Sequence, residues 1–126
     1  MAERLISIRI FENALISGLA TGVESSAIRI DRDVIRVESL TFLVSSVVST
    51  PDVGFTYAPS PDNITFGSYA DNTALLASTV SLTNPEGFQT LAMPTMLAPY
   101  FKIMCSGVTS NPTDTRCTAD IWLRMS

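Results

Sequence analysis

The chain has no histidine among its 126 residues, and it has only two cysteines. Histidine is the commonest general base near neutral pH and the commonest metal ligand, so its absence removes Ser-His and Cys-His nucleophile pairs. Two cysteines without histidine cannot complete the tetrahedral ligand set of a structural zinc site. We therefore expect no enzymatic activity, no metal and no other cofactor.

Charge is also scarce. Charged residues make up 16% of the chain, compared with roughly 25% in an average domain. The net charge is −4 and the few basic residues are scattered, which argues against binding to nucleic acid. A low charge suggests that a partner covers part of the surface, although the many Ser and Thr residues offer another route to solubility.

Long apolar runs are missing as well. The segment from Leu5 to Ile10 is short and is interrupted by Ser7 and Arg9, so it does not resemble a secretory signal. No stretch approaches the length of a membrane span, and the six glycines are too dispersed for a phosphate-binding loop. These features predict a soluble protein made in a cytoplasm, without a membrane partner.

What the sequence has in quantity is alternation of apolar and polar residues with a period of two, interrupted by turn clusters. This pattern predicts one all-β domain over residues 1–126, an antiparallel β-sandwich of about eight strands, with a jelly roll as one form it could take. Residues 13–22 are expected to form a connection rather than a strand. The predicted core consists of Ile8, Ile28, Phe42, Phe55, Phe66, Phe101, Ile103, Ile121 and Leu123.

Turn residues suggest two hairpins. One spans residues 53–69 around the Pro59–Asn63 turn, and the other joins residues 101–105 to 117–123 through residues 110–114. In a simple hairpin Cys105 and Cys117 would face each other across adjacent strands. They could form a disulfide, but two buried free thiols are the favoured interpretation in a cytoplasm. Asp62 is interpreted as a turn residue, with a calcium ligand as the weaker alternative.

A few apolar residues are candidates for an interface with another protein. Trp122 falls on the polar face of its strand, where it would either anchor an interface or be covered by a loop of its own chain. Methionine adapts its shape to different contacts, so the connector after residue 92 could join an interface or line the core. The candidate interface residues are Leu5, Ile6, Met93, Met96, Leu97 and Trp122.

The segment V-G-F-T-Y-A-P-S-P-D-N-I-T-F-G-S-Y-A-D-N at residues 53–72 resembles a pattern of small β-sandwich virion structural proteins of tailed phages. Residues 24–30 and 98–103 look like the entry strand and the start of the last strands of such proteins. The shared positions are structural, so no functional residue is carried over. The same framework also occurs in carbohydrate-binding and discoidin-like modules.

The resemblance implies a component of the virion, most simply a subunit that decorates or cements the capsid. Its partner would be the major capsid protein, and it would form a homo-oligomer, with a trimer favoured. A neck, tail or baseplate component is one alternative, and a carbohydrate-binding module is another.

Overall fold

The computed structural model describes residues 3–16, 23–45, 52–67, 80–81, 88–93, 98–107 and 115–126. Every regular element in these ranges is a strand, and all of the strand pairs are antiparallel. The strands are β1 (Arg4–Leu15), β2 (Val23–Glu24), β3 (Ile28–Arg29), β4 (Val34–Ser45), β5 (Asp52–Ser60), β6 (Val80–Ser81), β7 (Gln89–Ala92), β8 (Tyr100–Ser106) and β9 (Arg116–Met125). No helix that could cross a membrane occurs in the described ranges.

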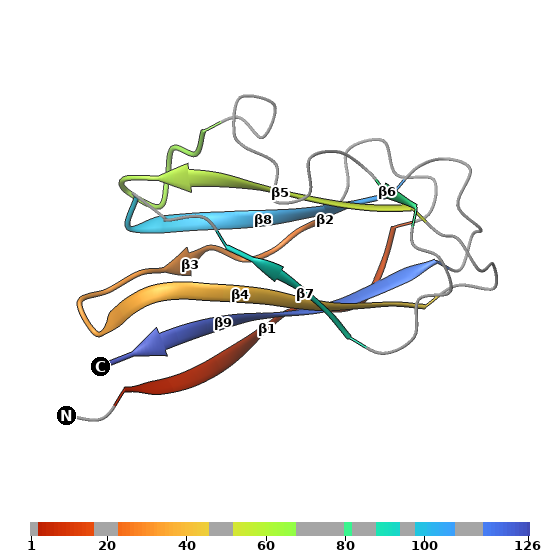
Figure 1. Cartoon of the computed structure of the whole chain (residues 1–126). Coiled ribbons are helices and arrows are strands. Elements are labelled where there is room, and N and C mark those ends of the chain that lie inside the picture. The colour runs from red at the N-terminus through yellow and green to blue at the C-terminus, as the bar shows by residue number, and fades with distance from the viewer. Residues whose placement is uncertain are drawn as a thin grey trace.

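The strands form two sheets that stack face to face (Figure 1). Sheet A has the order β1-β9-β4-β7, and sheet B has the order β2-β8-β5-β6, with β3 also paired to β8. The predicted antiparallel β-sandwich is therefore confirmed.

β2 and β3 are two pieces of one strand, because both pair with β8 and Ser25 keeps the contact between them. The Ser25 N–H donates to the Ile103 carbonyl (2.8 Å), and the Ser25 Oγ accepts from the Ile103 N–H (3.0 Å). If β2 and β3 are counted as one strand, the described strands number eight in chain order. Sheet A then has the order first-eighth-third-sixth, and sheet B has the order second-seventh-fourth-fifth. This is the strand order of a jelly roll, in which the chain crosses repeatedly between the sheets.

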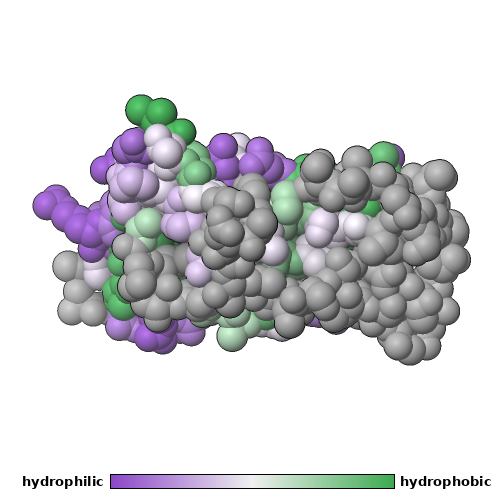
Figure 2. Space-filling model, turned by 90° about the horizontal axis from the view of Figure 1, so that it is seen from above, coloured by the Kyte–Doolittle hydropathy of each residue, from purple (hydrophilic) through white to green (hydrophobic). Residues whose placement is uncertain are grey.

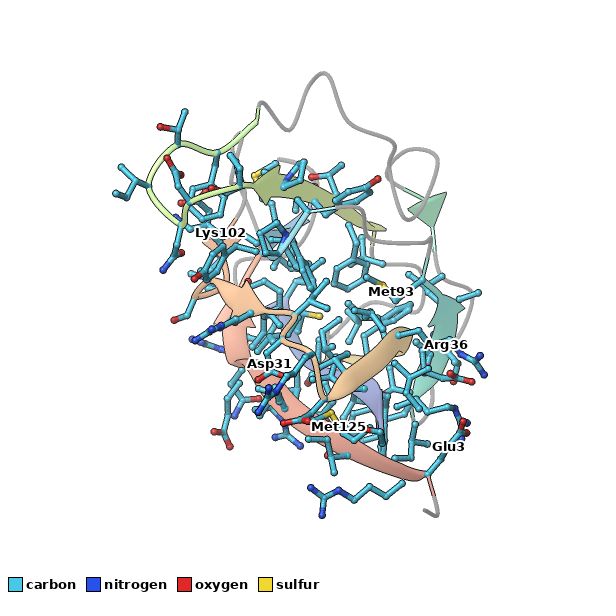
Figure 3. All side chains as sticks on the ribbon, turned by 90° about the vertical axis from the view of Figure 1, so that its left-hand side faces the viewer. Glu3, Asp31, Arg36, Met93, Lys102 and Met125 are labelled. Atoms are coloured by element: carbon cyan, nitrogen blue, oxygen red, sulfur yellow. The ribbon has the colours of Figure 1, made fainter. Side chains whose placement is uncertain are left out.

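The core lies between the sheets, where side chains from both layers interdigitate (Figure 3). Phe42 of β4 and Phe55 of β5 meet across the layers with ring centroids 4.9 Å apart. Most of the predicted core is buried, namely Ile28, Phe42, Phe55, Phe101, Ile103, Ile121 and Leu123.

Two residues of the predicted core are not buried. Ile8 faces inward opposite Ile121, but its strand lies at the edge of sheet A, so 40% of it stays exposed. Phe66 lies beyond the end of β5 and is half-buried, with the Lys102 Nζ 4.4 Å from its ring centroid. For these two residues the predicted place in the buried core was wrong.

β1 runs to Leu15, so the connection expected from residue 13 begins later. Two register shifts interrupt its pairing with β9, one between Arg9 and Phe11 and one between Phe11 and Ala14. At the second shift Asn13 adopts a φ of 48°, a left-handed conformation that asparagine tolerates better than most residues. The shifts bring Phe11 into the core after three alternating isoleucines.

The turn after β5 exists, but the expected hairpin does not. The Gly67 N–H donates to the Pro59 carbonyl (2.9 Å), so the chain does fold back. However, residues 61–67 form no strand, Ile64 is 84% exposed, and β5 pairs with β8 and β6 instead. The remaining residues of the predicted hairpin, 68 and 69, lie outside the described residues.

β8 and β9 do not form a hairpin either, because β8 belongs to sheet B and β9 to sheet A. Cys105 and Cys117 therefore approach each other across the interior rather than along neighbouring strands. Both are fully buried free thiols, as the favoured interpretation predicted. The hydrogen bond between them and the burial of the site raise the pKa of the Cys105 thiol.

Candidate interaction surface

The outer face of sheet A centres on Trp122. Alternation along β9 sends this side chain away from the core, between Ser7 of β1 and Ser39 of β4. Ala92 of β7 follows Ser39 in the same cross-strand row. A large aromatic ring is therefore flanked by small side chains, which leave room for a partner to approach it.

The indole ring is held in place by its own chain. Trp122 is half-buried, and its Nε1–H donates to the Oγ1 of Thr41 on β4 at 2.9 Å. Because the polar edge of the ring is already satisfied, what remains for a partner is apolar ring surface. A rigid aromatic side chain of this kind is typical of interface anchors.

An ion pair borders the ring on one side. The Arg9 guanidinium donates to both carboxylate oxygens of Asp120, at 2.6 and 3.4 Å, and lies 3.8 Å from Glu12. The hydrogen bond with Asp120 raises the pKa of Arg9. These charges satisfy one another within the face.

A larger charged cluster borders the other side. Arg124 of β9 contacts Glu38 at 3.2 Å and Glu3 at 3.5 Å, while Arg36 contacts the same Glu38 at 2.6 Å. The hydrogen bonds from Arg36 and then Arg124 lower the pKa of Glu38 to about 2. In Figure 3 Arg36 and Glu3 lie on the same outer margin of the molecule. Two groups of charges that are paired within the chain thus border the aromatic ring.

The structure separates the candidate interface residues predicted from the sequence. Leu5 lies on the outer face opposite Arg124 and is 45% exposed. Ile6 points inward opposite Leu123 and packs against the core. Met93 also packs against the core, between the two layers (Figure 3). Met96 and Leu97 lie outside the described residues, so Trp122 and Leu5 are the candidates left on the surface.

Sequence reasoning missed the importance of β1 as an edge strand. In the part of the chain that the structure describes, β1 pairs only with β9. It carries Leu5, Ile8 and Leu15 with exposed fractions of 45%, 40% and 38%. Alternation identifies the two faces of a strand but does not say which strand lies at an edge, so no sequence signal marked Ile8 or Leu15.

A groove opens beside this edge. It has a volume of about 320 Å³ and lies between residues 8–10 of β1 and residues 26–29 around β3. Ile8, Ile10 and Ile28 give it an apolar lining, and Arg9 and Arg29 add positive charge. The groove is where the two sheets part along one side of the sandwich.

The opposite face of the sandwich, seen from above in Figure 2, mixes hydrophilic and hydrophobic residues in the part of the chain that the structure describes. Within those residues no three His, Cys, Asp or Glu side chains gather as metal ligands would.

Asp62 is held by its own loop, where it accepts from the N–H groups of Ile64 (2.9 Å) and Thr65 (2.8 Å). These hydrogen bonds, led by that of Thr65, lower the pKa of Asp62.

The fold has counterparts among solved structures. The chain is similar to part of a chain in the structure of infectious bursal disease virus, Gx strain. The TM-score is 0.56 and the identity 14%, over 98% of this chain and 32% of that one. It thus spans about a third of the viral chain.

A second solved structure is the SPBc2 prophage-derived protein YomS, with a TM-score of 0.44 and 16% identity, over 97% of this chain and 96% of that one. No family model and no curated protein sequence matches this chain.

Proposed function

We propose that the protein is a structural component of a virion. The observation that carries this proposal is the jelly roll, which fills the described part of the chain and also occurs in a chain of a virus structure. Jelly rolls are common building blocks of viral capsids, but lectin domains and cupins use them too. The proposal therefore also needs support from the surface of this chain.

The surface supports a role in assembly. The charges that border Trp122 are paired within the chain, and the ring lies among small residues with its N–H already bonded. Interface centres are typically depleted in free charge and enriched in aromatic anchors. The ring of Trp122 can be desolvated at low cost as the centre of an interface, and the ion pairs around it fit the polar rim.

Within the virion, we favour a subunit that decorates the shell by placing the Trp122 face on the major capsid protein. Contacts of this kind bind the assembled shell but not its unfolded subunits, so they stabilise the particle through the area they bury. The same arrangement could serve in a neck, tail or baseplate, where far fewer copies would be present.

The first experiment is quantitative mass spectrometry of purified particles of the virus that, under this proposal, encodes the chain. A copy number comparable with that of the major shell subunit supports decoration, and a small fraction of it assigns the chain to the neck, tail or baseplate. Complete absence from the particle contradicts the virion proposal.

The docking face is tested by adding purified chain to particles that lack it. We expect wild-type protein to bind and Trp122→Ala to lose most binding. Met104→Ala, which truncates a half-buried apolar side chain on the outer face of sheet B, should bind like the wild type. Equal binding by all three proteins would show that the Trp122 face is not the docking site.

A carbohydrate-binding module is the second candidate, because Trp122 offers an aromatic face bordered by the Arg9–Asp120 pair. Sugars stack on such rings while polar neighbours bond their hydroxyls. Since the chain has one tryptophan, its fluorescence reports directly on this site. Saturable quenching by an oligosaccharide, lost in Arg9→Ala, would favour this candidate, and unchanged fluorescence across a glycan panel would exclude it.

A further inference from the structure

β1 offers a pairing edge whose regular part runs from Arg4 to Arg9. We call this stretch the β1 edge. Its outward backbone groups have no strand partner in the described part of the chain. Proteins usually protect exposed edges with charged residues, especially lysine, or with proline or bulges. The β1 edge contains no lysine or proline, and the register shifts of β1 begin only after Arg9. Its two charges are Arg4 at its first position and Arg9, which Asp120 of the same chain holds.

We propose that two copies of the chain pair antiparallel along the β1 edge, about a two-fold axis through Ser7. Sheet A would then continue from one copy into the other as a single sheet. The pairing goes beyond the virion role and does not depend on it.

The side chains of the β1 edge are complementary to themselves in this register. A two-fold axis perpendicular to the sheet places residues of the same face opposite each other. With the axis at Ser7, Ile6 of each copy lies opposite Ile8 of the other on the inner face. On the outer face Leu5 lies opposite Arg9, whose aliphatic stem can pack on it.

The charge of Arg9 does not oppose this arrangement. Its guanidinium is held by Asp120 of its own chain at 2.6 Å, and no like charge lies across the axis from it. Leu5 and Ile8, exposed by 45% and 40% in the single chain, each gain a neighbour from the other copy. The pairing therefore covers the apolar residues that the edge leaves open to water.

Neighbouring registers are less favourable. An axis at Ile6 would place Arg4 of one copy against Ile8 of the other, which sets a charge on an apolar face. An axis at Ile8 would have to use Ile10, the extra residue at the first register shift. The axis at Ser7 keeps residues 5–9 of both copies on regular backbone and pairs Ile6 with Ile8 on the inner face, so Arg4 and Ile10 meet only at the two ends of the paired stretch.

The groove beside β1 supports a second copy as the occupant. Ile8 and Ile28 line it in each chain, and the symmetry brings the two grooves to the same side of the joined sheet. The interface is isologous and closes at two copies, in contrast to the trimer expected from the resemblance. Because the paired segment is short, we expect a weak dimer.

Cross-linking through Ser7 tests both the pairing and its register. Directly opposite residues of an antiparallel pair have Cβ atoms about 4.5–5.5 Å apart, close enough for a disulfide after a small adjustment. Under mild oxidation Ser7→Cys should shift from monomer to covalent dimer on a non-reducing gel. The native Cys105 and Cys117 are fully buried and do not compete.

The matched control is Ser45→Cys, which places a thiol at another exposed position, the end of β4, a strand that is not at an edge. It should remain monomeric. If Ser7→Cys does not cross-link, or if both variants cross-link at the same rate, the proposed pairing is wrong.

A charge exchange at the axis provides a second, non-covalent test. Ser7→Arg and Ser7→Asp each place like charges opposite themselves, so both should be monomeric by analytical ultracentrifugation. An equimolar mixture of the two should dimerise more strongly than the wild type, because opposite charges then meet. No dimer in the mixture, with both variants folded by circular dichroism, would overturn the proposal.

Discussion

The role of Trp122 can be tested through the stability of the isolated chain. The change is Trp122→Ala, which removes a half-buried ring and its hydrogen bond to Thr41. If the ring belongs to a binding surface, its removal should cost little folding free energy. If it belongs to the core, the cost should equal that of a core aromatic residue.

The expected magnitude follows from the contacts of the ring. One intramolecular hydrogen bond contributes roughly 0.5–1.5 kcal/mol, and cross-strand packing contributes about 0.2–1 kcal/mol per pair. With two such pairs, to Ser7 and Ser39, Trp122→Ala should lower the free energy of unfolding by about 1–3.5 kcal/mol. Phe42→Ala, which empties a fully buried core position, should lower it by about 3–5 kcal/mol.

The assay is urea unfolding of wild type and both variants, followed by circular dichroism because Trp122→Ala removes the only tryptophan. Thr41→Val adds a check, since it removes the hydrogen-bond acceptor and keeps the ring. Its cost should not exceed about 1.5 kcal/mol. A Trp122→Ala cost equal to that of Phe42→Ala would refute the assignment of Trp122 to a binding surface.

Three further predictions concern the charged cluster, the core and the loop after β5. The pKa of Glu38 is about 2 in the folded chain and about 4.3 when unfolded. Its stabilisation is therefore complete above the unfolded value and is lost as the pH falls through the folded value. Thermal unfolding should show Glu38→Gln less stable than wild type at pH 7, with a difference that shrinks as the pH falls from about 4.3 toward 2. A double-mutant cycle of Phe42→Leu and Phe55→Leu should give a coupling free energy of about 0.5–1.5 kcal/mol in urea unfolding, and additive changes would mean that the rings do not interact. Asp62→Ala should accelerate hydrogen exchange at the Ile64 amide without changing global stability. Asp62→Asn keeps the acceptor oxygen and should protect that amide nearly as well as the wild type. Unchanged exchange in Asp62→Ala would contradict the loop geometry.

The sequence predicted the faces of β8 and β9 correctly because these strands alternate without interruption. Residues 101, 103 and 105 and residues 117, 119, 121 and 123 all face the core. Where an extra residue enters a strand, as in β1 near Ile10 and in β4 near Glu38, the period shifts and simple alternation fails.

Partner choice between strands was harder to predict than the strands themselves. The turn residues before β9 are equally suited to a hairpin and to a crossing between sheets, so they did not show that β8 and β9 separate. The exposure of Ile8 has the same origin, because it depends on which strand ends the sheet. For the candidate surface, the sequence identified Trp122 and Leu5, but not the charged pairs that frame the ring.

The placement of β9 in the middle of sheet A has a consequence for the order in which the chain folds. Both β1 and β4 take β9 as their neighbour, so neither finds this partner until residues 116–125 have been synthesised. Contacts between segments this distant in sequence form slowly and leave strands unpaired in the meantime. Until β9 has been synthesised, β1 and β4 lack their shared neighbour, so sheet A is completed in one late step rather than strand by strand.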